Sequence, residues 1–351
     1  MKAWLLSKTA DLNQTATPLG FQDVKKPVPG DHEVLIRVHV CGICHTEIDE
    51  IEGRLTPSRM PMIPGHQVVG HIESCGKRIS KLKTGDRVGV GWIFSACGAC
   101  DYCTRGNENL CSDFIATGRD RPGGYAEWMT VPESYAFPVP EQFKDEEAAP
   151  LLCAGAIGYR SLRLTGITDG QCLGLTGFGA SAHLVLKTAG FCFPRSEIIV
   201  FARSETERHF ALDLGAAWAG DTTDSPPRLC DAIIDTTPVW KPVVEALKHL
   251  RPGGRLVINA IRKESADQTL LTDLDYTSQL WMEKEIKTVA NVTGRDIREF
   301  LEIASKIPIR PEVQMYPFHT ANEALIDLKA GRIRGAKVLQ VMPPSPGPWS
   351  G

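Results

Sequence analysis

The feature that most constrains this chain is an alternation of apolar, strand-like runs with helix-like segments, which begins near residue 146. We place strands at 171–176, 198–202, 232–235, 255–260 and 286–291, and helices at 180–189, 204–214, 239–250 and 297–306. Strands that alternate with helices form βαβ units, so this part predicts an α/β fold with a doubly wound parallel sheet. Ser204 and Glu207 have the spacing of a capping box at the start of the second helix.

The first strand-to-helix turn of that sheet is rich in glycine and runs from Gly177 to Ala182. It is a G-x-G-x-x-A variant of the dinucleotide-binding fingerprint, and it stands between a strand and a helix as that motif requires. Gly177 permits the tight turn, Gly179 lets the backbone approach a pyrophosphate, and Ala182 allows close packing of helix on sheet. We therefore expect a nicotinamide dinucleotide at this turn, whereas a glycine turn without a ligand is the alternative.

The end of the second strand bears on which nicotinamide cofactor is used. A fold selective for NAD(H) usually places an acid there, but this chain has Ala202, followed by Arg203 and Ser204. An arginine and a hydroxyl at this place can hold a 2′-phosphate. The sequence therefore favours NADP(H) over NAD(H), although Arg203 facing water or stacking on adenine is the alternative.

The first 150 residues have short β-rich runs, EVLIRVHVCGI, VVGHIESC, DRVGVGWI and YAEWMTVP, separated by glycine and proline turns. This pattern is typical of an irregular, mostly antiparallel β domain. The tail from about Pro308 returns to short mixed elements and is expected to pack on that first domain. We predict a first domain of 1–153 and 295–351 and a dinucleotide-binding domain of 154–294.

Composition excludes several classes of partner. The formal net charge of -3 offers no basic surface for nucleic acid, and no apolar run reaches the roughly 18 residues that span a membrane. The eleven cysteines are an odd number, and no secretory leader precedes them. We therefore expect a cytoplasmic protein without a disulfide framework, in which Cys172, Cys192 and Cys230 are thiols of the core.

Four cysteines are crowded into a lobe at 95–113: Cys97, Cys100, Cys103 and Cys111. Their spacing suits a tetrahedral zinc ion with four thiolate ligands. Such an ion has no open position for a substrate, so we expect a structural zinc site.

A second, scattered set consists of Cys44, His66 and Cys153. Each alone would more often be a packed core residue than a ligand. Together they offer two thiolates and an imidazole, which is the ligand set of a catalytic zinc with a vacant fourth position. The sequence therefore predicts two zinc ions for each chain.

These motifs together resemble the zinc-dependent medium-chain alcohol dehydrogenases, over nearly the whole chain. The resemblance is carried by CGICHTEID at 41–49, PGHQVVG at 64–70, TGDRVGV at 84–90, the four-cysteine lobe, GGYAEW at 123–128 and LLCAG at 151–155. It implies a GroES-like β domain joined to a Rossmann domain. It also implies reversible hydride transfer between a primary, or a secondary, alcohol and a nicotinamide cofactor, with small alcohols or aldehydes as substrates, in a homodimer or homotetramer.

Carried over to this sequence, the resemblance assigns roles near the three ligands. Thr46 would relay the proton of the alcohol, His45 would lie near the cofactor pyrophosphate, and Trp92 would line the substrate pocket. Cys41 matches no ligand of the family, although it forms a C-x2-C pair with Cys44.

Two residues near the expected zinc depart from the family pattern. Gln67 replaces a glutamate behind the zinc, so a charge that tunes the metal is expected to be lost. Asp49 replaces the histidine that ends the proton relay, and either its carboxylate or solvent would accept the proton.

Two other functions fit parts of the pattern. A zinc-free quinone or enone reductase would share the fold but would lack both cysteine sets. A non-catalytic zinc-ribbon binding protein would need a basic surface, whereas Asp101, Glu108 and Asp113 accompany Arg105 here. Metal content distinguishes the three: two zinc ions, none, or one.

Overall fold

The computed structural model describes residues 1–331 and 335–343, and the chain divides into two compact units. Unit 1 contains Met1–Cys153, Val292–Glu302 and the described residues from Arg310 onward, and unit 2 contains Ala154–Asn291 and Ile303–Ile309. The predicted border differs from this division at 292–294 and 303–309. Lys187 Nζ donates to the carbonyl of Pro308 at 3.4 Å, a contact that attaches this short segment to unit 2.

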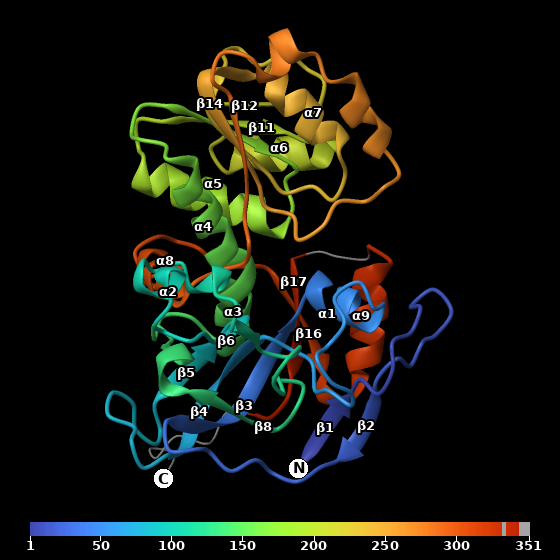
Figure 1. The fold of residues 1–351 in the computed structure, drawn as a ribbon, viewed down its shortest axis with the longest axis vertical. Helices are drawn as coiled ribbons and strands as arrows, with labels where there is room; N and C mark the ends of the chain where they lie inside the picture. The colour runs from blue at the N-terminus through green and yellow to red at the C-terminus, as the bar shows by residue number, and fades with distance from the viewer. Residues whose placement is uncertain (332–334, 344–351) are drawn as a thin grey trace. The chain divides into compact units, whose positions relative to one another are not determined.

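Unit 1 is built on a mostly antiparallel sheet with the strand order β16-β17-β3-β4-β5-β9, in which β8 also pairs with β3 (Figure 1). The strands are β3 (Glu33–Ile43), β4 (Gln67–Cys75), β5 (Arg87–Val90), β8 (Trp128–Pro132), β9 (Phe137–Pro138), β16 (Val313–Pro317) and β17 (Ala336–Gln340). Two small antiparallel pairs accompany the sheet, β1 (Lys2–Leu5) with β2 (Gly20–Asp23) and β6 (Ile93–Ser95) with β7 (Ile115–Ala116). The predicted antiparallel β domain is confirmed.

The core of unit 1 follows the two-residue period of β3. Val34, Ile36 and Val38 are fully buried in one cluster, because alternate residues of a strand share a face. Leu325 of α9 (Ala321–Lys329) belongs to the same cluster. The other helices of unit 1 are α1 (His45–Ile51), α2 (Asp101–Thr104), α3 (Asp145–Pro150) and α8 (Gly294–Ala304).

Unit 2 has the predicted parallel sheet. Its order, β12-β11-β10-β13-β14-β15, is that of a doubly wound dinucleotide-binding fold. The strands are β10 (Cys172–Thr176), β11 (Glu197–Phe201), β12 (Trp218–Gly220), β13 (Cys230–Asp235), β14 (Leu250–Ile258) and β15 (Glu285–Thr288), and the helices are α4 (Ala156–Thr165), α5 (Ala180–Cys192), α6 (Glu205–Asp213) and α7 (Lys241–Lys248). The α/β class expected from the alternation is therefore confirmed.

The two faces of this sheet have separate cores. Leu173 and Leu175 of β10 pack in the same cluster as Val185 of α5, whereas Cys172 of that strand packs with Val243 of α7. Strands buried on both faces are continuously apolar, which is why these runs show no polar alternation in the sequence.

Three local predictions had mixed outcomes. Helix α6 begins after Ser204 as expected, but the Ser204 side chain makes no capping hydrogen bond, so the capping-box prediction is wrong. Cys172 and Cys230 are buried as predicted, whereas Cys192, the last residue of α5, is only partly buried. Among the described residues, no helix combines the length and apolar character needed to cross a bilayer.

A cluster of ionisable side chains in unit 1 anchors the start of α3. One carboxylate oxygen of Asp145 lies 2.8 Å from His39 Nδ1, and the other accepts a hydrogen bond from Arg87 Nε at 2.7 Å. The His71 ring lies near that of His39, tilted by 38°, with ring centroids 4.6 Å apart. Burial opposes ionisation of Asp145, but the hydrogen bond from His39 and the charge of Arg87 outweigh it and lower the pKa of the carboxyl.

We predict that Asp145→Asn lowers the free energy of unfolding by about 1–3 kcal/mol at neutral pH, because it leaves buried donors of His39 and Arg87 poorly paired. The folded pKa of Asp145 lies below the unfolded value of about 3.9, so its contribution is complete above that value and is lost as pH falls through the folded pKa. Urea denaturation across the pH range measures this difference. Asp31→Asn is the matched control, since Asp31 and Arg78 are exposed at 4.0 Å; an equal loss there, or a loss independent of pH, would contradict the prediction.

Candidate active site

The structure brings Cys44, His66 and Cys153 together in unit 1. The Sγ atoms of the two cysteines are 4.0 Å apart, and His66 Nε2 lies 3.3 Å from Cys153 Sγ. One ligand atom from each of the three residues lies within 4.8 Å of the others. The three side chains come from segments far apart in the sequence, and they form a compact set of possible metal ligands.

Local backbone structure explains how each ligand reaches this place. Cys44 is the N-cap of α1, at the junction that follows β3. His66 directly precedes β4 and follows Gly65, whose φ of +98° favours glycine. A Cβ atom at Gly65 would lie 2.4 Å from the ring of Tyr125, so only glycine fits there. Cys153 lies in a π-helical turn, Leu151–Gly155, that continues from α3.

Glu47 is the partner of His66 that the sequence analysis missed. Glu47 Oε1 lies 2.5 Å from His66 Nδ1, and its other oxygen accepts the backbone N–H of Cys44 at 2.8 Å. Both Glu47 and His66 are buried. The signal was present in the sequence, since Glu47 stands three residues after the N-cap Cys44, where a glutamate side chain reaches back to the helix start.

The ionisation of these groups shows a site prepared for a cation. The hydrogen bond from Cys153 and the nearby His66 hold the pKa of Cys44 well below its usual range, although burial opposes this. Burial lowers the pKa of His66, but the carboxylate of Glu47 and the thiolate of Cys44 outweigh it and raise that pKa well above its ordinary value. The negative field that favours a proton on His66 also favours a metal ion.

The residues present fit a zinc ion. Thiolate sulfur and imidazole nitrogen are the donors that Zn²⁺ prefers, and three protein ligands leave one position open. The bond from His66 Nδ1 to Glu47 leaves Nε2 for the metal, which is the usual carboxylate–histidine arrangement around zinc.

The other residues expected near the zinc take different positions. Thr46 Oγ1 lies 3.6 Å from Cys44 Sγ, and the Trp92 ring meets the His66 ring edge to face at 5.1 Å. Gln67 is buried at the start of β4, and His45 is exposed at the start of α1. Asp49 accepts a hydrogen bond from Arg54 Nε at 2.6 Å and forms an ion pair with that guanidinium.

The second cysteine set also gathers in space. The Sγ atoms of Cys97, Cys100, Cys103 and Cys111 all lie within 4.8 Å of one another. Backbone N–H groups of Ala99 and Cys100 donate to Cys97 Sγ and lower the pKa of that thiol to about 6. A thiolate is the form that binds metal, so these four side chains can hold a closed zinc site.

The glycine turn of unit 2 has the geometry that a dinucleotide requires. Gly177 has a φ of +76°, and Gly179 is the exposed N-cap of α5, with no atom within 4 Å of the place where a Cβ would stand. Ala182 is fully buried in the core between α5 and the sheet. The N-terminus of α5 therefore offers free backbone N–H groups, which favour an anion such as a pyrophosphate.

The end of β11 carries the residues expected to select the cofactor. Ala202 is buried, and Arg203 and Ser204 are exposed. Arg208, which the sequence analysis missed, donates to the carbonyls of Ala202 and Arg203 at 2.8 and 2.9 Å. The polar groups close to the end of β11 in the chain therefore include the guanidinium groups of Arg203 and Arg208 and the hydroxyl of Ser204.

Comparison with known proteins gives relatives for the whole chain. Residues 30–141 match the family described as "Alcohol dehydrogenase GroES-like domain". The chain is 41% identical over 346 residues to "Probable alcohol dehydrogenase AdhA" from Mycobacterium tuberculosis (strain CDC 1551 / Oshkosh), covering 97% of each protein. It is 30% identical over 345 residues to an alcohol dehydrogenase from Geobacillus stearothermophilus, covering 95% of this chain and 99% of the relative.

A solved structure agrees with these relatives. The crystal structure of CAD from Helicobacter pylori, complexed with NADP(H), is 26% identical and superposes with a TM-score of 0.81 over 97% of each chain. The fold, the sequence identity over nearly the whole length and the two cysteine sets lead to one conclusion. This chain is an enzyme of the zinc-containing medium-chain alcohol dehydrogenase family.

Proposed function

We propose that this alcohol dehydrogenase is zinc-dependent, holds two zinc ions and oxidises small primary alcohols with NADP⁺ in a reversible reaction. The observation that carries the proposal is the set of Cys44, His66 and Cys153, whose ligand atoms lie within 4.8 Å of one another. A panel of alcohols and aldehydes assayed against both cofactors tests it. Turnover that needs no zinc, or that prefers NAD⁺, would contradict the corresponding part.

Bound zinc and nicotinamide would supply part of the chemistry, and the chain's own residues would supply the rest. When bound, zinc polarises the alcohol oxygen and lowers its pKa, and the nicotinamide exchanges a hydride with the alcohol carbon. Thr46, whose hydroxyl lies 3.6 Å from Cys44 Sγ, takes the alcohol proton and passes it on. Asp49, which is paired with Arg54, is the proposed acceptor further along.

The substrate range is expected to depend on Trp92. Its ring is buried against His66, and the guanidinium of Arg119 lies 5.9 Å from the ring centroid. A bulky, buried ring beside His66 limits the space next to the proposed ligands. This supports small or medium primary alcohols and aldehydes as substrates.

The preference for NADP(H) rests on the end of β11. Ala202 places no carboxylate at the end of β11, where one would bind a ribose 2′-hydroxyl, and Arg203 and Ser204 are exposed beside it. Asp221, which follows β12, is paired with Arg208 at 3.8 Å. The similarity to a structure complexed with NADP(H) adds support.

Removing a catalytic ligand gives the first test. We expect Cys44→Ser and His66→Ala to lower kcat at least about 1000-fold and to reduce bound zinc from two ions to one. Binding of NADPH, measured by fluorescence, should persist, because the glycine turn belongs to unit 2. If a variant that has lost the zinc ion of the three-ligand site kept its activity, the assignment would be wrong.

Matched controls separate the ligands from their neighbours. Cys41 is fully buried, and burial raises the pKa of its thiol well above the ordinary value, so it stays protonated. Cys41→Ala should therefore keep both zinc ions. Cys100→Ser should lose the zinc of the four-cysteine lobe and reduce thermal stability, while the other zinc ion remains measurable.

The hydrogen bond of Glu47 gives a second test. Glu47→Gln keeps the shape but removes the charge beside His66, and such losses typically cost about 10–100-fold in zinc affinity. Competition with a chelator should show faster zinc release from this variant, at the three-ligand site alone. Unchanged release would show that Glu47 does not support the metal.

Cofactor choice gives a third test. Ala202→Asp introduces a carboxylate where a 2′-phosphate is expected, so the ratio of kcat/KM for NADP⁺ over NAD⁺ should fall about 100-fold. Arg203→Ala should lower the same ratio about tenfold through a loss with NADP⁺ alone. Equal losses with both cofactors would contradict the proposed 2′-phosphate contact.

A further inference from the structure

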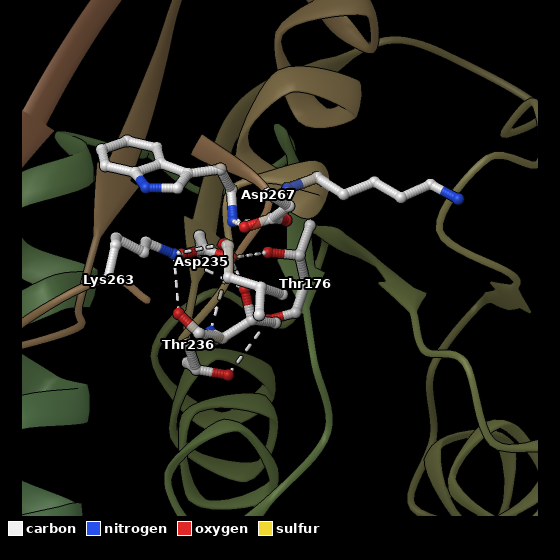
Figure 2. Close-up of polar contacts among 9 residues, drawn as sticks. Thr176, Asp235, Thr236, Lys263 and Asp267 are labelled. Atoms are coloured by element: carbon white, nitrogen blue, oxygen red, sulfur yellow. Dashed lines mark hydrogen bonds and ion pairs between the residues drawn. The ribbon is translucent and has the colours of Figure 1, made fainter. Parts of the chain in front are cut away.

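A buried ion pair lies at the carboxyl edge of the parallel sheet in unit 2 (Figure 2). Asp235, the last residue of β13, is fully buried, and the side chain of Lys263, in the chain after β14, is 6% exposed. Lys263 Nζ donates to Asp235 Oδ2 in a very short contact. A charged pair this deeply buried is costly unless each group is well satisfied.

Both members of the pair are fully engaged. Asp235 Oδ1 accepts hydrogen bonds from the hydroxyls of Thr176 and Thr237, each at 2.7 Å. Lys263 Nζ also donates to the carbonyls of Thr237 and Val239, at 2.6 and 3.0 Å. Figure 2 shows these bonds converging from several segments, so the pair ties together the ends of β10, β13 and the chain after β14.

The pair supports the glycine turn directly. Thr176 immediately precedes Gly177, and its carbonyl accepts both the backbone N–H and the hydroxyl of Thr236, each at 3.0 Å. A Cβ atom at Gly177 would lie 2.8 Å from Cγ2 of Thr237. The turn therefore rests on the segment that Asp235 and Lys263 hold.

A second carboxylate fixes the far end of that segment. Asp267 accepts the backbone N–H groups of Trp240 and Lys241, at 2.9 and 2.8 Å, where α7 begins (Figure 2). The chain that follows β14 thus holds residues 235–241 at both ends, through Lys263 and Asp267.

The charges of Asp235 and Lys263 affect how well the Gly177 turn can bind an anion. The carboxylate of Asp235 is one hydrogen bond away from the residue before Gly177, so alone it would repel a pyrophosphate. The ammonium of Lys263 cancels that charge. In a low-dielectric interior such a cancellation affects a nearby anion more strongly than it would in water.

We propose that Asp235 and Lys263 are positioning residues for the dinucleotide cofactor, which support the Gly177 turn and keep the charge beneath it near zero. This inference rests on the proposed binding of NADP(H) at that turn. It predicts that the two residues, although partners, affect cofactor affinity in opposite directions.

The test measures the Kd of NADPH by fluorescence with the full chain. Lys263→Met leaves the carboxylate of Asp235 without its cationic partner, so the Kd of NADPH should rise about tenfold or more. Asp235→Asn keeps the oxygen that accepts from Thr176 but removes the negative charge opposite Lys263, so the Kd of NADPH should fall by a factor of about two to ten. A purely structural brace would raise the Kd in both variants. That outcome, or an unchanged Kd in both, overturns the inference.

Further variants keep the test decisive. Lys263→Arg replaces Lys263→Met if the latter variant does not fold. Because arginine retains the charge, this variant should keep the wild-type Kd, and Asp235→Asn should still lower the Kd. A rise of the Kd in either variant overturns the inference.

Gly179→Asp tests the proposed function separately. A Cβ at this position has open space and aspartate is a good N-cap, so the fold should persist. If Gly179→Asp binds NADPH as the wild type does, the cofactor site itself is wrong, whatever the other variants show.

Discussion

The arrangement of the three proposed metal ligands depends on the hydrogen bond between His66 and Glu47. His66 is buried, so its Nδ1 needs an acceptor, which the carboxylate of Glu47 supplies. The same carboxylate also accepts the backbone N–H of Cys44, so one side chain orients two of the three ligands. Because Glu47 is buried, its charge is not screened by water and it acts on the thiols and the imidazole at short range. The carboxylate of Glu47 therefore contributes both to the positions of these side chains and to the negative charge around them.

The third ligand depends on a different ionic contact. Cys153 lies in the π-helical turn that directly follows α3, and the first residue of α3, Asp145, is held by Arg87 of β5 and His39 of β3. A helix of six residues has little stability of its own and needs such tertiary contacts. The sheet of unit 1 thus helps to position Cys153, because it holds Asp145, which stands eight residues earlier in the chain.

The sequence predicted what depends on local pattern. The parallel strands of unit 2 are continuous apolar runs, and the glycine turn and four-cysteine lobe have short, specific spacings, so these features could be recognised. The spacing of Glu47 to Cys44 was a local signal that was missed, whereas the bond of Glu47 to the His66 ring and those of Arg208 to backbone carbonyls are defined only by the fold. The bond between Asp235 and Lys263 joins residues 28 apart with no motif between them. The capping box failed because the spacing of Ser204 and Glu207 does not ensure that the hydroxyl turns inward.

Two buried carboxylates, Glu47 and Asp235, have partners that suit the ligand proposed for each site. Beside the three proposed metal ligands, Glu47 bonds the imidazole of His66 and the backbone N–H of Cys44, and its negative charge favours a cation there. Beneath the glycine turn, where an anion is expected, Asp235 is matched by the ammonium of Lys263. A buried carboxylate needs hydrogen bonds in either case, and both residues have them. Asp235 has the ammonium of Lys263 as its partner, whereas Glu47 bonds an imidazole whose other nitrogen can itself bind a cation.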